Sequence, residues 1–213
     1  MEEILLIGAG GHCKSVIDSI LSKREYKIYG VLDCKEKLGT SVCGYPVNYT
    51  DEELEQLYDK GIRNAFICIG SIGNCLIRKK IYEKAKIIGY YFPTICDASA
   101  TISQFASIGE GVFIGKRCVI NSDVSVGNMA ILNTGSIIEH DCKIGDYAFI
   151  SIGVNLSGGV VVGNETHIGT GANVIQGIHI GSNSIIGAGS VVTKNISSHK
   201  KAYGIPCKEV TEW

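Results

Sequence analysis

The chain has 213 residues, of which 19% are charged, and its formal net charge is −1. A chain of this length holds one large or two small domains, and its charge balance excludes a general attraction to nucleic acid or to an anionic membrane. No apolar run reaches the ~20 residues that cross a bilayer, and the acidic start predicts a strand rather than a signal peptide. Nine cysteines without a C-x-x-C pair predict free thiols in a reducing cytoplasm, not disulfides or a zinc site.

Residues 1–92 show alternating strand and helix patterns. EILLIGAGGH is an apolar strand that runs into glycines, and CKSVIDSILSK follows it with helical spacing. YKIYGVLDC predicts a second strand, RNAFICIGSIG a third, and NCLIRKKIYEKAKIIG a second helix. This alternation predicts a small Rossmann-like domain with a parallel sheet, in which ligands bind at the carboxyl ends of the strands.

Residues 93–213 contain a six-residue repeat. Sixteen branched aliphatic residues stand at every sixth position from Ile102 to Val192, and glycine directly follows eight of them. A period of six would spread these residues around a helix, whereas strands interrupted by a turn every six residues keep them inward. We therefore expect an all-β parallel solenoid in which the aliphatic residues stack in columns, with glycine supplying turn conformations at the corners.

The repeat resembles the hexapeptide repeat of acyltransferases built on a left-handed β-helix, in which three hexads make one triangular coil. The tail from Gly204 to Lys208 also resembles the end of that family. A short α/β domain that opens with IGAGGH and precedes the repeat resembles the bacterial sugar acyltransferases that include sialic acid O-acetyltransferases and nucleotide-amino-sugar N-acetyltransferases. This resemblance implies a cytoplasmic enzyme of bacterial glycan biosynthesis that uses acetyl-CoA, binds no metal and forms a homotrimer.

The glycine loop after the first strand is the predicted nucleotide-sugar site. It lacks the third glycine of a dinucleotide fingerprint, since Cys13 stands there, so by itself it could be only a tight turn. Backbone amides at a helix start nevertheless suit a diphosphate. The resemblance implies that Gly10, Gly11 and His12 contact the diphosphate and that Asp33 contacts the nucleoside. It also implies that Gly70 and Ser71 line the same cleft.

His140 and Asp141 are the predicted catalytic pair. Ile138 and Cys142 occupy the inward columns of this hexad, so the side chain of His140 should point outward. A histidine titrates in the range needed to take a proton from an attacking amine, and a neighbouring carboxylate can orient it. The segment NTGSIIEHDC resembles the subgroup's active-site segment, which implies that His140 is the general base.

The resemblance also assigns residues to the acceptor and to acetyl-CoA. Asn133, seven residues before His140, would contact the acceptor sugar. Phe149 stands where the subgroup often has a second histidine in the acyl-CoA pocket, which leaves open the acyl group accepted. The backbone amide of Gly158 would face the thioester. The expected acetyl-CoA-binding residues are Phe149, Gly158, Thr170 and Ala188.

Two substrates remain open: the amino group of a UDP- or dTDP-linked amino sugar, which the glycine loop favours, and a hydroxyl of sialic acid or a related nonulosonic acid. Zinc carbonic anhydrases share the solenoid, but they need two histidines five residues apart on one coil, and the repeat has no such pair. His167 and His179 occupy outward places in their hexads and are expected to be solvated or at an interface.

Overall fold

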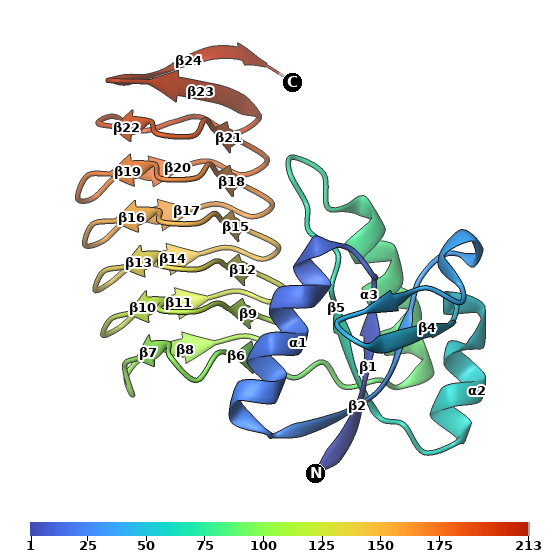
Figure 1. The fold of residues 1–213 in the computed structure, drawn as a ribbon. Helices are drawn as coiled ribbons and strands as arrows, with labels where there is room; N and C mark the ends of the chain where they lie inside the picture. The colour runs from blue at the N-terminus through green and yellow to red at the C-terminus, as the bar shows by residue number, and fades with distance from the viewer. Residues whose placement is uncertain (213) are drawn as a thin grey trace. The chain divides into compact units, whose positions relative to one another are not determined.

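The computed structural model describes residues 1–212, and its contacts divide the chain into two units (Figure 1). The first unit comprises residues 1–71 and 75–95, and the second comprises residues 72–74 and the chain from residue 96 onward. The second unit therefore begins close to the boundary after residue 92 that the sequence predicts. Within residues 1–212, no helix is long and apolar enough to span a membrane.

The N-terminal unit contains the expected Rossmann-like sheet, with the strand order β3-β4-β2-β1-β5. All neighbouring strands are parallel except the short hairpin β3–β4. The strands are β1 (Glu2–Ile7), β2 (Tyr26–Leu32), β3 (Ser41–Val42), β4 (Tyr45–Tyr49) and β5 (Asn64–Ile67). The helices are α1 (Gly11–Lys23), α2 (Leu54–Asp59) and α3 (Leu76–Ile88), with short 3-10 turns η1 (Lys35–Lys37) and η2 (Asp51–Glu53). The pattern predicts α1 and α3, whereas β3, β4 and α2 are too short to show a clear period.

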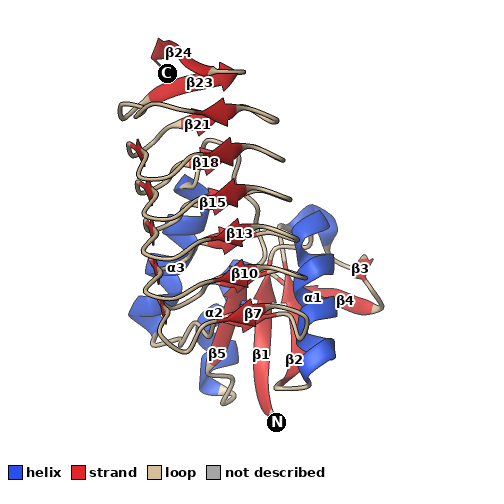
Figure 2. Ribbon diagram, turned by 90° about the vertical axis from the view of Figure 1, so that its left-hand side faces the viewer, coloured by secondary structure: helices blue, strands red, loops and turns tan. Residues whose placement is uncertain are grey.

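The second unit is a left-handed β-helix whose two-residue strands form three parallel sheets, and a longer antiparallel pair, β23 and β24, extends the third sheet (Figures 1 and 2). The first sheet contains β7 (Thr101–Ile102), β10 (Val119–Ile120), β13 (Ile137–Ile138), β16 (Asn155–Leu156), β19 (Asn173–Val174) and β22 (Val191–Val192). The second contains β8 (Ser107–Ile108), β11 (Ser125–Val126), β14 (Lys143–Ile144), β17 (Val161–Val162) and β20 (His179–Ile180). The third contains β6 (Ile95–Cys96), β9 (Phe113–Ile114), β12 (Ile131–Leu132), β15 (Phe149–Ile150), β18 (His167–Ile168), β21 (Ile185–Ile186), β23 (Lys200–Gly204) and β24 (Cys207–Glu212).

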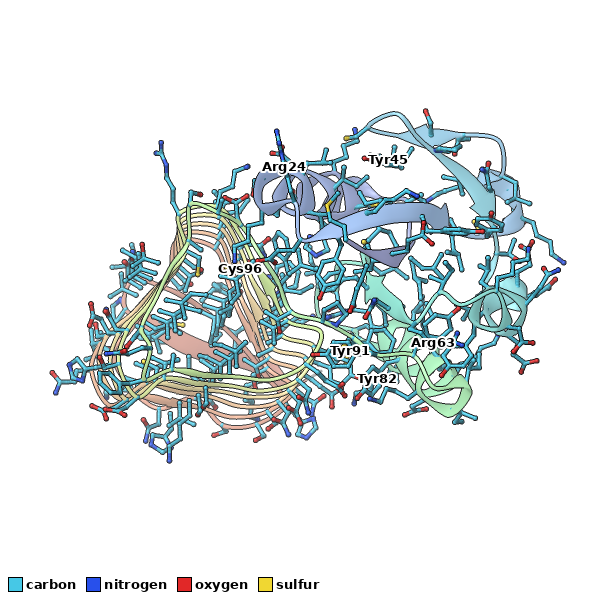
Figure 3. All side chains as sticks on the ribbon, turned by 90° about the horizontal axis from the view of Figure 1, so that it is seen from below. Arg24, Tyr45, Arg63, Tyr82, Tyr91 and Cys96 are labelled. Carbon is cyan, nitrogen blue, oxygen red and sulfur yellow. The ribbon has the colours of Figure 1, made fainter. Side chains whose placement is uncertain are left out.

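The repeat builds the core of this unit by stacking each aliphatic residue on the one 18 positions later. Ile120 pairs with Ile138, and Ile138 pairs with Leu156. Seen along the solenoid in Figure 3, the coils have a triangular outline filled by side chains. The inward aliphatic and small-residue columns are confirmed, and of the sixteen aliphatics of the six-residue period Ile102 alone, in the open first coil, is exposed.

The glycines that directly follow an aliphatic have a different role from the one the sequence suggests. The third residue after each aliphatic from Ile108 to Ile186 adopts the left-handed backbone, and non-glycine residues such as Asp123 (φ 59°) do so as well. Gly127, which directly follows an aliphatic, lies outside that region; a Cβ on it would lie 2.6 Å from the amide nitrogen of Asp146 in the next coil. The expectation of turn conformations is therefore wrong for these glycines, which are needed because successive coils approach so closely.

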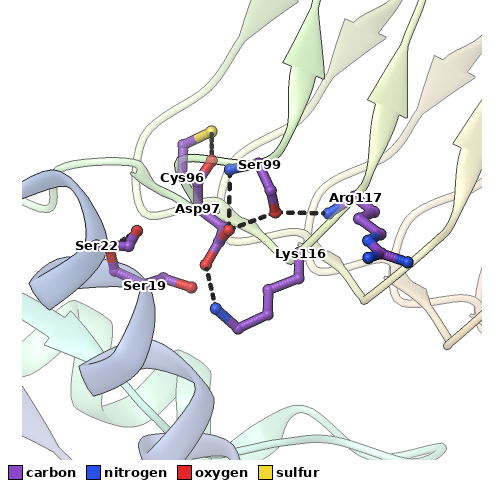
Figure 4. Close-up of polar contacts among 7 residues, drawn as sticks. All are labelled: Ser19, Ser22, Cys96, Asp97, Ser99, Lys116 and Arg117. Atoms are coloured by element: carbon purple, nitrogen blue, oxygen red, sulfur yellow. Dashed lines mark hydrogen bonds and ion pairs between the residues drawn. The ribbon is translucent and has the colours of Figure 1, made fainter.

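A buried ionic network closes the first coil of the solenoid (Figure 4). The Asp97 side chain is almost fully buried, and its Oδ1 accepts hydrogen bonds from the amide and the hydroxyl of Ser99. Lys116 Nζ lies 3.0 Å from Asp97 Oδ2, and the Arg117 amide donates to Ser99 Oγ at 3.1 Å. These contacts tie the entry of the solenoid to its next coil.

Candidate active site

The corner between β13 and β14 presents His140 and Asp141 together. His140 Nδ1 lies 2.8 Å from Asp141 Oδ2, and the two side chains are 60% and 65% exposed. Consecutive side chains of a strand point to opposite faces, but the left-handed backbone of Asp141 (φ 62°) breaks that alternation. The hydrogen bond that His140 donates to Asp141 raises the pKa of His140 above its usual value. Because Nδ1 donates to the carboxylate, Nε2 is left as the basic nitrogen.

Gly158, one coil after His140, provides the surface under the imidazole. A Cβ at this position would lie 2.6 Å from Cε1 and 2.7 Å from Nε2 of His140. The neighbouring amide of Gly159 donates to the His140 carbonyl oxygen at 2.8 Å, which fixes the spacing of the two coils. The absence of a side chain at Gly158 therefore makes room for the ring, a role beyond the amide donor that the sequence suggests.

The remaining assigned residues of the solenoid lie elsewhere in its cross-section. Asn133, Thr170 and Ala188 belong to the corner that follows the third sheet, and Phe149 lies in β15 of that sheet. The first sheet separates this corner from the corner of His140. One chain therefore does not bring the two groups together.

His167 differs from its expected position. It pairs in register with Phe149, and the two rings stack with centroids 4.9 Å apart and an interplanar angle of 27°. His167 is only 7% exposed, and its Nε2 lies 3.4 Å from Ser151 Oγ. The expectation of a solvated side chain is wrong for His167, because Phe149 and Ser151 pack against it, whereas His179 is exposed.

The glycine loop lies between β1 and α1 in the N-terminal unit, as expected. Gly10 is the N-cap of α1, which begins at Gly11. A Cβ on either glycine would meet no atom within 4 Å, so packing inside the protein does not require glycine here. Bare amides at a helix N-terminus beside open space are well suited to an anionic group such as a diphosphate.

Asp33 and His12 both lie beside this loop, with different protonation. Burial would raise the pKa of Asp33, but hydrogen bonds from the amides of Ala9 (2.5 Å) and Cys34 (2.7 Å) and from Lys37 (3.0 Å) lower it to about 2. The Asp33 carboxylate therefore holds the loop. Burial, and then the charge of Arg78, lower the pKa of His12 to about 4, so His12 would meet a phosphate as a neutral hydrogen-bonding group.

Arg78 is a residue that the sequence did not single out. It lies in the first turn of α3, it is almost fully buried, and its Nη1 donates to Ser71 Oγ at 3.2 Å. Ser71, one of the two cleft residues expected after β5, is also buried. In the sequence Arg78 is one of several basic residues in a helical segment. The spacing of these basic residues does not distinguish Arg78 from solvated neighbours such as Lys80.

Family comparisons agree with this architecture. Residues 3–85 match the PglD N-terminal domain, residues 106–139 the hexapeptide repeat of succinyl-transferase, and residues 159–194 the bacterial transferase hexapeptide (six repeats). A perosamine N-acetyltransferase from Caulobacter crescentus, solved with CoA and GDP-perosamine, is 33% identical over 100% of this chain and 98% of that one, with a TM-score of 0.93. The chain belongs to the family of hexapeptide-repeat sugar N-acetyltransferases.

Two further relatives of this hexapeptide-repeat family cover nearly the whole chain. The acetyltransferase domain of PglB from Neisseria gonorrhoeae, solved with acetyl coenzyme A, is 31% identical over 98% of this chain and 99% of that one, with a TM-score of 0.88. WeeI from Acinetobacter baumannii is 26% identical over 99% and 100%, with a TM-score of 0.83. None of the curated proteins matches the chain.

The enzyme is therefore an acyltransferase with acetyl-CoA as its co-substrate, as the sequence predicts. Residues 1–212 contain no group of three or more His, Cys, Asp or Glu side chains arranged to hold a metal ion.

Proposed function

We propose that this enzyme transfers the acetyl group of acetyl-CoA to the amino group of a nucleotide-linked sugar, with His140 as the general base. The observation that carries the proposal is the outward His140–Asp141 pair, set against the bare backbone of Gly158. An exposed imidazole with Nδ1 hydrogen-bonded to a carboxylate and Nε2 left as the basic nitrogen has the arrangement needed to take a proton from an incoming nucleophile.

The reaction would proceed by direct attack. The sugar amine attacks the thioester carbonyl carbon as His140 Nε2 removes an amine proton, and a tetrahedral oxyanion forms. The C–S bond then breaks, the amide is released, and the imidazolium returns the proton to the departing thiolate of CoA. Asp141 stabilises the imidazolium, which accords with the raised pKa of His140.

A homotrimer would complete this site. His140 and Gly158 lie at one corner of the solenoid, whereas Asn133, Phe149, Thr170 and Ala188 lie at or beside another, so a second copy must supply the second group. Cyclic association of identical chains brings unlike corners of neighbouring copies together.

Mixed trimers test this arrangement. His140→Ala and Asn133→Ala chains, each of low activity alone, should regain activity when they are unfolded, mixed and refolded together, because one interface in the mixed trimer has both intact residues. The same chains refolded separately and then combined are the control. Failure of the mixture to exceed that control would contradict a shared site.

The N-terminal unit supports a nucleotide-linked acceptor. The open glycine loop at the start of α1 suits a diphosphate. Asp33, which directly follows β2 and bonds to the amide of Ala9 in this loop, would contact the nucleoside. The relative solved with GDP-perosamine carries a guanine nucleotide, whereas the family resemblance of the sequence implies a uridine or thymidine nucleotide. The nine free cysteines accord with a cytoplasmic enzyme, where nucleotide sugars and acetyl-CoA meet.

Thermal stabilisation by UDP, dTDP, GDP and CMP distinguishes these acceptors, because a ligand that binds only the folded state raises the melting temperature. We expect stabilisation by UDP or dTDP. Stabilisation by GDP alone would show that the acceptor carries a guanine nucleotide instead of a uridine or thymidine nucleotide. Stabilisation only by a free or CMP-linked nonulosonic acid would favour O-acetylation instead.

His140→Ala tests the base. We expect the melting temperature and acetyl-CoA binding to be unchanged, because the side chain is exposed, and kcat to fall by about 10²–10⁴, the usual contribution of a positioned base. His179→Ala, which removes another exposed histidine of the solenoid, is the matched control. Normal turnover by His140→Ala would contradict the mechanism.

A further inference from the structure

Three polar residues, Asn133, Ser151 and His167, interrupt the repeat of the third sheet at three successive strands, β12, β15 and β18. The residue that directly follows the strand is Gly115 after β9 and Gly169 after β18, where a Cβ would lie 2.8 and 2.6 Å from backbone nitrogens of the next coil. Asn133 follows β12, and Ser151 follows β15.

The outward residue of these strands is apolar in four places and polar in one. The apolar ones are Phe113 in β9, Ile131 in β12, Phe149 in β15 and Ile185 in β21, and the polar one is His167 in β18. Departures from an otherwise regular pattern are expected where function demands them. Asn133 is already assigned to the acceptor; Ser151 and His167 have no assignment.

Ser151 and His167 form a buried polar pair. Ser151 is 4% exposed and His167 is 7% exposed, and Ser151 Oγ lies 3.4 Å from His167 Nε2. The Phe149 ring stacks on the imidazole and holds its plane. Burying polar side chains on an otherwise apolar face is unfavourable unless they are hydrogen-bonded, so contact between these two favours their burial together.

The pair lies at the height of the catalytic corner. Strands 18 residues apart are paired, which sets a rise of about 4.8 Å for each coil. His140 and Gly158 span one such step, and Ser151 lies between them in the chain. In a cyclic trimer whose axis runs along the solenoid, identical residues keep equal heights, so the corner of Ser151 in one copy would lie level with the His140–Gly158 step of the next.

We propose that the Ser151 hydroxyl donates a hydrogen bond to the thioester carbonyl oxygen of acetyl-CoA, and that His167 positions it; this inference rests on the proposed function. When His167 Nε2–H donates to Ser151 Oγ, the hydroxyl hydrogen is free for the carbonyl oxygen. That oxygen gains negative charge as the amine attacks, so the hydrogen bond is stronger in the transition state than in the bound thioester. Ser151 is then a catalytic residue and His167 a positioning residue.

The test compares Ser151→Ala with wild type in the full-length protein. Calorimetry should show acetyl-CoA binding weakened by about 2- to 10-fold, the worth of one neutral hydrogen bond, with CoA binding unchanged because CoA has no acetyl carbonyl. The kcat should fall on the order of 10², as for other oxyanion donors, with little change in KM for the sugar. Ser190→Ala, which removes another buried solenoid hydroxyl, is the control.

His167 variants test the positioning role. His167→Phe keeps a ring beside Phe149 but removes the donor, so it should lower kcat, and Ser151→Ala should add little to it. His167→Gln, which keeps an N–H donor, should restore part of the loss. Additive effects of His167→Phe and Ser151→Ala would overturn the positioning role even if both proteins fold.

The two proposals fail in distinguishable ways. If Ser151→Ala retains the wild-type kcat and the wild-type affinity for acetyl-CoA, the hydroxyl is not at the thioester, and this inference is overturned while the N-acetyltransferase proposal stands. If wild type acetylates no amino sugar, the proposed function fails, and a selective loss of acetyl-CoA over CoA affinity in Ser151→Ala still supports the Ser151 contact.

Discussion

Gly158→Ala is the sharpest test of how the catalytic histidine is placed. The new methyl carbon would lie 2.6 Å from Cε1 and 2.7 Å from Nε2 of His140, whereas non-bonded carbon atoms prefer about 3.5–4.0 Å. The imidazole must therefore move by roughly 1 Å. Because the ring is 60% exposed, it can swing into solvent, and the free energy of unfolding should change by only about 0.5 kcal/mol.

The effect on catalysis should be far larger than the effect on stability. A misplacement of about 1 Å can cost on the order of 10² in rate, so we expect kcat to fall by about that factor with little change in the melting temperature. Release of the CoA thiol, followed with acetyl-CoA and an amino-sugar acceptor, measures kcat, and thermal unfolding measures stability. The double variant Gly158→Ala/His140→Ala should be no slower than His140→Ala alone. Wild-type kcat in Gly158→Ala would refute the reasoning, as would a loss of activity that adds fully to that of His140→Ala.

Three further changes have defined outcomes. Asp141→Asn replaces the carboxylate that raises the pKa of His140 with a neutral amide; since only the neutral imidazole is a base, the rise of kcat/KM with pH should move to lower pH, and an upward shift would contradict the pairing. Gly127→Ala places a Cβ 2.6 Å from the Asp146 amide nitrogen, which is backbone and cannot swing away, so it should destabilise the solenoid by about 1–3 kcal/mol or more in denaturant unfolding. Lys116→Met removes the ammonium from the buried Asp97 carboxylate, and a loss of about 1–3 kcal/mol is expected, with kcat per folded enzyme unchanged; unaltered stability would show that Ser99 alone sustains the carboxylate.

Much of the fold could be predicted because the repeat is a local pattern. From Ile108 onward, each aliphatic position of the six-residue period lies on the inner side of a coil. Such a pattern indicates which side chains are buried together, and a solenoid is the structure that buries all of them on its inner side. The same pattern shows that His140 points outward, since Ile138 and Cys142 already fill the core positions.

The pattern was less informative where a contact spans coils. The glycines after the aliphatics suggest turn conformations, but their cause is the backbone 18 residues away, as Gly127 shows. His167 reads as a surface histidine because its hexad place is outward, and only the stacking of Phe149 and the position of Ser151 bury it.

The sequence by itself determined the solenoid, the Rossmann-like domain and the outward orientation of the His140–Asp141 pair, because hydrophobic periodicity and local neighbours decide each of these. Only the tertiary structure decided that Gly158 makes room for the imidazole, that Ser151 and His167 are buried together, and that Asn133 lies at a different corner from His140. Those relations join residues of different coils or different sides of a coil, and their spacing follows from the stacking of the coils rather than from any stretch of chain.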